Sequence, residues 1–310
     1  MITWVIGSTG LLGSAITRRC RETLASTMFT PEPIPWDDPE RASQDLAAHT
    51  TGFADMAGAG DWAIIWAAGA ATVSSSMDKA EPELTALRAV VTALRDSPPA
   101  GRGAFFLTSS AGGVYAGSVG APFTETTLVR PLSPYGEIKV QQEQTARSAL
   151  DGVCPLIIGR FSNVYGPGQN LDKPQGLVSR LALATATRQP INIFVSLDTI
   201  RDYLYVDDAA QQVAALLSQV ILHSLARPET TVRVLASGEP VALGHLIQTM
   251  QLVTKRRVPV ALGSHPSSAS QVLDLRLMPS LVPNEGTSLP IGTKRVYDDI
   301  HRRLQYPRAH

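Results

Sequence analysis

The sequence predicts an α/β fold in which a doubly wound parallel sheet is covered by helices on both faces. Short, uninterrupted apolar runs alternate along the chain with longer segments whose apolar residues recur at helical spacing. The short runs show no polar face, as expected for parallel strands that are buried on both sides. Hydrophobic residues make up 44% of the 310 residues, which is enough to build a large core.

The predicted elements follow one another in alternation. The apolar runs expected to form strands span residues 2–6, 62–66, 103–108 and 155–161. A further strand is expected at residues 34–36, among the prolines that precede Asp37 and Asp38. Helical patterns between the strands span residues 11–24, 81–95 and 133–150.

After about residue 165 proline and glycine become frequent, and helical patterns continue at residues 177–188, 207–223 and 243–255. We therefore expect a sheet domain over residues 1–165 and a smaller, interleaved region over residues 166–310. The pattern leaves open whether residues 191–201 up to Leu222, and residues 232–236, return to the sheet domain.

Bulk properties argue against several classes of partner. The 27 basic residues balance the 27 acidic ones, so no overall positive field attracts nucleic acid or an anionic membrane. The two cysteines, Cys20 and Cys154, are too far apart to suggest a disulfide framework. The six histidines are scattered without ligand spacing, so no metal site is expected. The absence of a leader pattern or a long apolar run predicts a cytoplasmic protein.

A glycine-rich turn follows the first predicted strand and opens the first helix. Its glycines, Gly7, Gly10 and Gly13, have the spacing G-x-x-G-x-x-G. A pyrophosphate must approach the N–H groups of a helix N-terminus closely, and side chains would block it there. This turn therefore predicts a Rossmann-type dinucleotide site, with Thr9, Leu11 and Leu12 contributing cofactor contacts alongside the glycines.

An acidic residue about 20 positions further on usually binds the ribose 2′-hydroxyl in such folds. Asp37 is the candidate here, and an acid at this place favours NAD over NADP because it repels a 2′-phosphate. The alternative is that Asp37 and Asp38 cap a helix that begins near Pro39. The expected cofactor is NAD, with NADP left open.

The segment from Ser133 to Lys139 contains the candidate acid/base residues. Ser133 is a favourable N-cap, so Tyr135 and Lys139 are expected four residues apart on one helix face. A neighbouring ammonium favours the phenolate of a tyrosine, which then serves as an acid/base group. Lys139 also has donors for the hydroxyls of a cofactor ribose.

Hydroxyl groups at the carboxyl end of a strand face the crevice where parallel sheets bind ligands. Ser109 and Ser110 occupy that position after the predicted strand 103–108. Ser110 is our choice for the hydroxyl that orients the substrate oxygen, and Ser109 is the second candidate. The alternative for each serine is ordinary turn chemistry.

At these residues the chain resembles the extended short-chain dehydrogenase/reductases of the NAD-dependent epimerase/dehydratase family. The resemblance also covers the segments 66–69, 159–168 and 201–208. It implies cofactor contacts from Ala67, Ala68 and Gly69, and a nucleotide-sugar substrate whose diphosphate lies between the last two segments. Asn163, Arg201 and Arg276 are the implied substrate-binding residues, together with Ser109. An ion pair between Arg201 and Asp202 is the structural alternative.

The resemblance implies a transient keto sugar, made by an epimerase or a 4-ketoreductase. Ser110 is followed by residues 111–113 without an acid, which argues against a 4,6-dehydratase. A reductase of a small non-nucleotide ketone and a non-catalytic dinucleotide sensor remain as alternatives. A homodimer is also implied, formed by helices near residues 81–95 and 133–150. The alternative is that the apolar residues of the first helix face the sheet.

Overall fold

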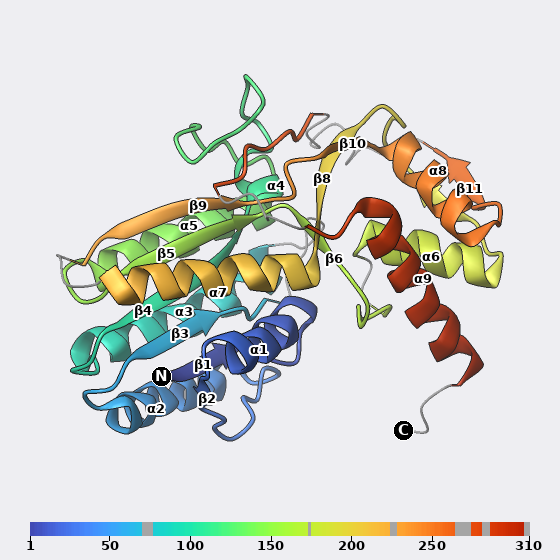
Figure 1. The fold of residues 1–310 in the computed structure, drawn as a ribbon. Coiled ribbons are helices and arrows are strands. Elements are labelled where there is room, and N and C mark those ends of the chain that lie inside the picture. The colour runs from blue at the N-terminus through green and yellow to red at the C-terminus, as the bar shows by residue number, and fades with distance from the viewer. Residues whose placement is uncertain (70–76, 173–174, 224–227, 264–273, 281–285, 307–310) are drawn as a thin grey trace.

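A computed structural model describes residues 1–69, 77–172, 175–223, 228–263, 274–280 and 286–306. Its larger part is a parallel sheet of six strands in the order β2-β1-β3-β4-β5-β9 (Figure 1). The strands are β1 (Ile2–Ile6), β2 (Thr27–Met28), β3 (Trp62–Trp66), β4 (Gly103–Ser110), β5 (Leu156–Phe161) and β9 (Thr230–Leu235). The strand order reverses between β1 and β3, and in sheets of this type ligands bind in the crevice at that point.

Helices cover both faces of this sheet, each with its own apolar cluster. The first face packs against α2 (Pro39–Ala57), α3 (Met77–Asp96) and α5 (Pro134–Leu150). The second face packs against α1 (Leu11–Thr23) and α7 (Val206–His223). The inner strands are buried along their length, except at Ser110 at the end of β4, as the uninterrupted apolar runs predicted. The predicted fold class is confirmed.

The predicted strand at residues 34–36 is wrong. The edge strand β2 lies earlier, where Thr27 pairs with Ile2 and Met28 with Thr3. Prolines at positions 31, 33 and 35 explain the difference, because proline lacks an N–H and restrains the residue before it. The chain crosses residues 34–36 outside any strand and then enters α2.

The smaller part contains the three-stranded sheet β10-β8-β6 and the two-stranded sheet β11-β7. Its helices pack around a third apolar cluster (Figure 1). The strands are β6 (Asn163–Tyr165), β7 (Ile191–Ile193), β8 (Ile200–Tyr205), β10 (Pro240–Ala242) and β11 (Val260–Leu262). The helices are α6 (Leu177–Thr187), α8 (Leu243–Thr254) and α9 (Leu289–Gln305).

The two parts are interleaved along the chain. After β8 the chain continues directly into α7, which packs on the large sheet, and β9 then joins the edge of that sheet. The chain returns to the smaller part at β10. Residues 206–223 and 230–235 therefore lie with the large sheet, whereas β7 and β8 belong to the small sheets.

Both cysteines are buried and free, which agrees with the expectation of no disulfide framework. Burial raises the pKa of the Cys20 thiol to about 12, and that of the Cys154 thiol likewise to about 12. Within the described part of the chain, no helix is both long enough and apolar enough to cross a bilayer.

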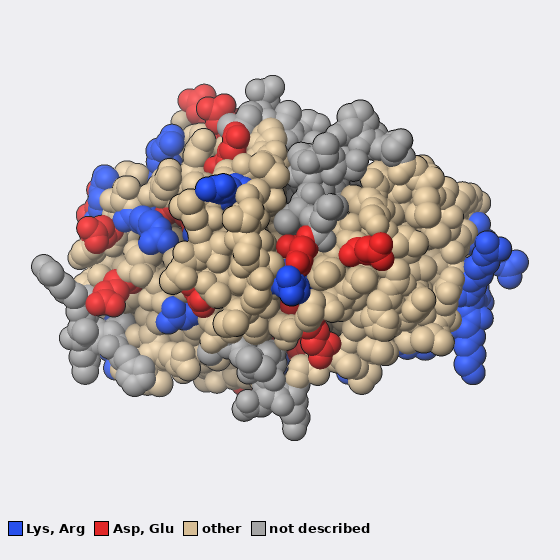
Figure 2. Space-filling model, turned by 90° about the horizontal axis from the view of Figure 1, so that it is seen from above, with Lys and Arg blue, Asp and Glu red and all other residues tan. Residues whose placement is uncertain are grey.

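Charged side chains are distributed unevenly over the surface. Figure 2 shows acidic and basic groups interspersed over the larger part, and basic groups without acidic ones at the far end of the smaller part. Arg188 after α6 and residues 255–257 after α8 are exposed. The pairing of β11 with β7 sets the segments before these two strands side by side. This basic end lies away from the carboxyl edge of the large sheet.

Candidate active site

The glycine-rich turn between β1 and α1 is built by close backbone contacts. Gly7 has a φ of +89°, and a Cβ on it would lie 2.6 Å from the Ala68 nitrogen. A Cβ on Gly13 would lie 2.1 Å from the Gly7 carbonyl oxygen. Both positions therefore require glycine. Gly10 is exposed at the N-cap of α1, and no side chain there accepts a hydrogen bond from the helix N–H groups.

This arrangement fits a dinucleotide pyrophosphate. Thr9 is exposed beside Gly10, so the outer side of the turn is open to a ligand. Leu11 and Leu12 are half-buried and pack against the apolar cluster on the second face of the sheet. Their side chains thus anchor α1 on the sheet. The predicted contacts to NAD in this turn stay predictions.

The segment after β3 lies against the same turn. The Ala67 N–H donates to the Ile6 carbonyl oxygen at 2.9 Å, and Ala68 is buried next to Gly7. Gly69 is exposed, and a Cβ on it would lie 3.2 Å from a carboxylate oxygen of Glu83. The structure therefore brings the three predicted cofactor residues of this segment together with the glycine-rich turn.

The two aspartates after the prolines have different roles in the structure. Asp38 is the N-cap of α2, and its side chain accepts a hydrogen bond from the Arg41 N–H at 3.1 Å. The capping alternative is thus confirmed for Asp38. Asp37 lies exposed in the turn before it, and its contact with a ribose remains a prediction.

Tyr135 lies in the first turn of α5, where Ser133 caps the helix by accepting from the Gly136 N–H at 3.2 Å. The Lys139 Nζ lies 5.7 Å from the centroid of the Tyr135 ring. A Cβ on Gly113 would lie 3.0 Å from the Tyr135 ring, so the ring packs closely on the start of α4 (Ala111–Val114). The predicted pair therefore shares one face of α5.

Ser110 is held next to the same glycine. It is the N-cap of α4, and its Oγ accepts a hydrogen bond from the Gly113 N–H at 3.2 Å. Because the Tyr135 ring and the Ser110 hydroxyl both contact Gly113, the two groups lie near each other at the carboxyl end of β4. The Ser110 O–H remains able to donate, which is what orienting a substrate oxygen requires.

Lys139 is buried and has two partners that the sequence analysis did not anticipate. Its Nζ donates to Glu83 Oε1 and to Gln142 Oε1, each at 2.9 Å. Burial opposes the charge on Lys139, but the charge and hydrogen bond of Glu83, together with Tyr135 and Glu143, outweigh it, and the pKa of the ammonium is raised. Gln142 could have been suspected from its i+3 position on α5, whereas nothing in the sequence pointed to Glu83, 56 positions away.

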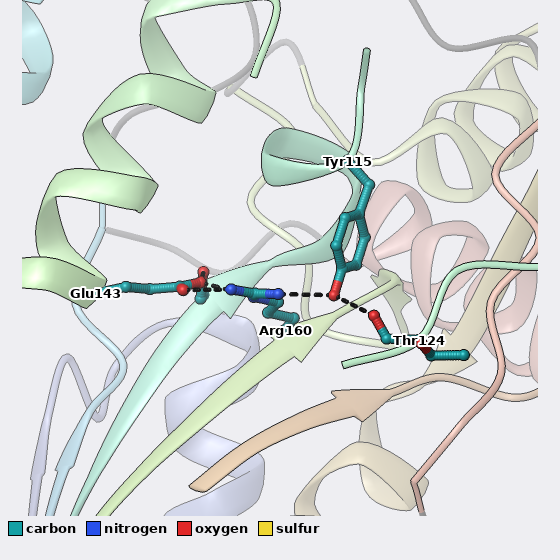
Figure 3. Close-up of polar contacts among 5 residues, drawn as sticks. Tyr115, Thr124, Glu143 and Arg160 are labelled. Atoms are coloured by element: carbon teal, nitrogen blue, oxygen red, sulfur yellow. Dashed lines mark hydrogen bonds and ion pairs between the residues drawn. The ribbon is translucent and has the colours of Figure 1, made fainter. Parts of the chain in front are cut away.

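Glu143, Arg160, Tyr115 and Thr124 form a polar network (Figure 3), which Ser109 joins through Glu143. The Ser109 Oγ donates to Glu143 Oε1 at 2.6 Å, and Arg160 donates two further hydrogen bonds to the same carboxylate at 3.0 and 2.7 Å. Arg160 also donates to the Tyr115 hydroxyl, which in turn donates to the Thr124 carbonyl oxygen, both at 2.7 Å. Because the Ser109 hydroxyl is engaged here, its role toward substrate stays a prediction.

The charges of this network compensate one another. Arg160 loses hydration on burial, yet its bonds to Glu143 and Tyr115 raise the pKa of the guanidinium. Burial raises the pKa of the Tyr115 hydroxyl above its ordinary value. The network fixes β5, α5 and the segment around Thr124 relative to one another, which holds the end of β4 in place.

Asn163 and Arg201 lie on the paired strands β6 and β8. The exposed Asn163 donates from Nδ2 to the Asp202 carbonyl oxygen at 2.8 Å. Arg201 is half-buried and donates from Nη1 to the Ile200 carbonyl oxygen at 2.9 Å. Burial lowers the pKa of the Arg201 guanidinium, although Tyr203 acts in the opposite direction.

The ion pair considered between Arg201 and Asp202 is not formed. The Asp202 carboxylate instead accepts from the Ser237 N–H, the Ser237 hydroxyl and the Gly238 N–H, at 2.8 to 2.9 Å. Within the described ranges, no carboxylate lies within ion-pair distance of Arg201. The guanidinium therefore retains donors for an anion.

Arg276 is placed differently. It is exposed and binds Asp274 through its Nε and Nη2, at 2.7 to 3.0 Å. The same fork of donors would be needed for a phosphate, so a substrate contact from Arg276 remains a prediction that requires this pair to open.

A small cavity lies between β8, the segment after β9 and the start of α9. Its volume is about 170 Å³. Its lining includes Tyr203, Ser237, Glu239, Val241 and Thr287. Across the described residues no group of three His, Cys, Asp or Glu side chains is arranged to hold a metal ion.

The fold and site define a class: a Rossmann-type protein with a glycine-rich dinucleotide turn and a tyrosine and a lysine paired on α5. The chain belongs to the NAD dependent epimerase/dehydratase family, whose model matches residues 3–223. The resemblance inferred from the motifs is thereby confirmed, and the family description agrees with the expected cofactor.

Known proteins support the same family at low identity. The chain is 28% identical to the dTDP-4-dehydro-6-deoxyglucose reductase of Escherichia coli over 173 residues, 54% of this chain and 52% of that protein. It is 34% identical to the dTDP-L-rhamnose 4-epimerase of Burkholderia thailandensis over 97 residues, 31% of this chain and 27% of the relative. The chain thus matches about half, or less, of the length of these curated relatives.

Solved structures resemble the whole chain in fold. A UDP-glucose 4-epimerase from Thermotoga maritima with UDP-glucose has a TM-score of 0.76 at 18% identity, covering 98% of this chain and 100% of that one. MoeE5 in complex with UDP-glucose and NAD has a TM-score of 0.75 at 21% identity, with 98% and 99% covered. At these identities the likeness shows the fold.

Replacing Arg160 by methionine should lower the free energy of unfolding by about 3–5 kcal/mol, because it leaves the Glu143 carboxylate buried without its cation. Urea denaturation measures this loss. Arg102→Met is the matched control, since Arg102 forms an exposed pair with Asp61 and should change stability little. Equal effects of the two substitutions would show that the buried pair is not what holds this region together.

Proposed function

We propose that this chain is an NAD-dependent enzyme that acts on a nucleotide-linked sugar, as an epimerase or a 4-ketoreductase. The observation that carries the proposal is that the Tyr135 ring lies 5.7 Å from the Lys139 ammonium and packs on Gly113, whose N–H also donates to the Ser110 hydroxyl. Relatives that share part of the chain are named as a reductase and an epimerase of dTDP-sugars. NADP remains the alternative cofactor.

The glycine-rich turn would hold the pyrophosphate of NAD, with Ala67, Ala68 and Gly69 beside it. The turn fits this group because Cβ atoms at Gly7 and Gly13 would fill it, and because the helix N–H groups at Gly10 have no side-chain cap. When bound, the nicotinamide accepts or returns a hydride. One N–H of Lys139 is left for a cofactor hydroxyl, since the other two are donated to Glu83 and Gln142.

Tyr135 would transfer the proton that accompanies this hydride. Its hydroxyl takes the proton of the sugar alcohol when the keto sugar forms, and returns a proton when the ketone is reduced. Ser110 would hold the same substrate oxygen through its free O–H. No acidic residue follows Ser110 in α4, so the proposal is for an epimerase or reductase and not for a 4,6-dehydratase.

Arg201 would bind the diphosphate of the substrate. Its guanidinium has a planar set of donors, and burial without a neighbouring carboxylate makes an anionic ligand favourable. Asn163 lies on the strand paired with β8 and would contribute an amide near the same ligand. A reductase of an apolar ketone would have no use for such a cation.

A thermal melt with added ligands tests the function directly. We expect NAD to raise the melting temperature, and one series among UDP-, GDP-, dTDP- and CDP-sugars to raise it further.

The substitution Tyr135→Phe should lower kcat by about 10²- to 10⁴-fold, while NAD still raises the melting temperature of the variant. Tyr306→Phe, at an exposed tyrosine, is the control and should leave kcat unchanged. Normal turnover by Tyr135→Phe would reject the mechanism, and a NAD shift without any sugar response would favour a small-ketone reductase or a sensor.

Arg201→Ala should weaken binding of the nucleotide sugar by about 10- to 100-fold and leave NAD binding unchanged, because it removes charged donors to the diphosphate. Calorimetric titration with each ligand measures both affinities. Arg233→Ala is a close control, because Arg233 is also half-buried and also donates from Nη1 to the carbonyl of the preceding residue. Equal losses for NAD and sugar would refute the assignment.

We also propose a homodimer formed through the outer faces of α3 and α5. The inner residues Leu87, Val90 and Leu94 pack against the sheet, so they are not available to a partner. A groove of about 470 Å³ remains between the helices. Its lining includes Arg88, Thr92, Gln141, Gln144 and Ser148. Light scattering should give twice the mass of one chain, and Arg88→Glu should shift this toward one chain. A monomer for the unaltered protein at micromolar concentration would refute the proposal.

A further inference from the structure

The Lys139 side chain is only 7% exposed, although it carries a full charge. Removing an ammonium from water is costly, and a buried lysine without an acidic neighbour commonly loses its proton near neutral pH. A neutral amine would neither favour the phenolate of Tyr135 nor present three donors. The proposed chemistry therefore depends on whatever keeps this lysine protonated.

Glu83 provides the direct counter-charge. Its Oε1 lies 2.9 Å from Lys139 Nζ, and its side chain is also only 7% exposed. Gln142 completes a triangle, because it donates from Nε2 to the same oxygen at 2.8 Å and accepts from Lys139 at 2.9 Å. Each side chain thus restrains the other two, and α3 is tied to α5 at the level of the tyrosine.

Two groups of α5 add to the effect of Glu83 on the pKa of Lys139. One is Tyr135, and the other is Glu143, whose carboxylate is already bound by Arg160 of β5 through two hydrogen bonds. The packed segments β4 and α4 contain no acidic or basic residue. Glu83 is therefore the acid in direct contact with the ammonium among the described residues.

The pair also touches the predicted cofactor segment. A Cβ on Gly69 would lie 3.2 Å from Glu83 Oε1, so the Glu83 carboxylate occupies the space beside this glycine. Glu83 therefore adjoins the predicted cofactor segment on one side and, through Lys139, the tyrosine on the other.

We propose that Glu83, fixed by Gln142, is a positioning residue that keeps Lys139 in its ammonium form and in place for proton transfer at Tyr135. The catalytic consequence rests on the proposed function, whereas the effect on the charge of Lys139 does not. Glu83→Gln is the informative substitution, because it keeps the shape of the side chain and one acceptor oxygen and removes the charge.

The first experiment needs no substrate. The free energy of unfolding is measured in urea from about pH 7 to about pH 10 for the unaltered protein, Glu83→Gln, Lys139→Met and the double variant. In the unaltered protein the raised pKa of Lys139 gives a stabilising contribution that is present below the ordinary lysine pKa and lost only at higher pH. In Glu83→Gln burial should dominate and lower that pKa, so the unfolded chain binds the extra proton and stability falls as pH falls.

The stability gap between the unaltered protein and Glu83→Gln should therefore be widest near pH 7 and narrow toward pH 10. Adding Lys139→Met to Glu83→Gln should abolish this pH dependence. Glu137→Gln is the matched control, since it neutralises an exposed carboxylate on α5 and should give a constant gap near zero. A gap for Glu83→Gln that does not vary with pH would overturn the proposal.

The second experiment connects the pair to catalysis. Glu83→Gln should lower kcat by about tenfold or more, with KM for the nucleotide sugar nearly unchanged, and should lose activity at a lower pH on the basic side of its profile than the unaltered protein. Glu83→Asp should restore part of kcat. Unchanged kcat and pH profile in Glu83→Gln would reject the positioning role. If the unaltered protein turns over no nucleotide sugar, the proposed function fails, while the stability experiment still decides whether Glu83 holds the charge of Lys139.

Discussion

Two buried ion pairs along one side of α5 are the constraint on which the site depends. Lys139 pairs with Glu83 of α3, and one turn later Glu143 pairs with Arg160 of β5. Four charges in a dry interior are tolerated only because each has a partner and further hydrogen bonds. This requirement fixes the rotation of α5 about its axis and its position along that axis relative to α3 and β5. Because Tyr135 extends from the first turn of the same helix, the two ion pairs also determine the position of Tyr135.

The glycine-rich turn depends on contacts of a different kind. Gly7, Gly13 and Ala68 approach one another so closely that no side chain could be added at either glycine. Steric exclusion shapes the glycine-rich turn, where the cofactor is expected, whereas paired charges shape the surroundings of Tyr135, where proton transfer is expected. The two meet at Gly69, which follows Ala68 in the chain and lies beside the Glu83 carboxylate.

Much of this architecture could be predicted from the sequence, because it is encoded locally. The apolar runs gave the inner strands, Ser133 marked the start of α5, and four-residue spacing put Tyr135 and Lys139 on one face. What failed was the edge strand, where prolines removed donors and the pairing moved to Thr27 and Met28. Edge strands pair on one side only, so the local pattern constrains them weakly.

The partners of the buried charges could not be predicted, because they come from segments far apart in the chain. The sequence contains no signal for Glu83, and it offered Ser109 as the second candidate after Ser110 for a substrate hydroxyl contact. Only the folded structure shows that Ser109 donates to Glu143 while Ser110 caps α4. Similarly, the adjacent residues Arg201 and Asp202 suggested an ion pair. Successive side chains of a strand point to opposite faces, however, so the two side chains have different partners.

The late return of the chain to the large sheet has a consequence for dissecting this protein. β9 reaches the edge of the sheet only after the chain has built β6, α6, β7 and β8 of the smaller part, and it covers β5 along six residues. A fragment that ended after β6 would include every motif of the dinucleotide half, yet it would leave β5 with a row of unsatisfied backbone donors and acceptors. An apolar edge strand without a partner tends to pair with strands of other chains, which leads to aggregation. Because of the interleaved topology, β9 from the second half of the chain protects the β5 edge of the first half from self-association.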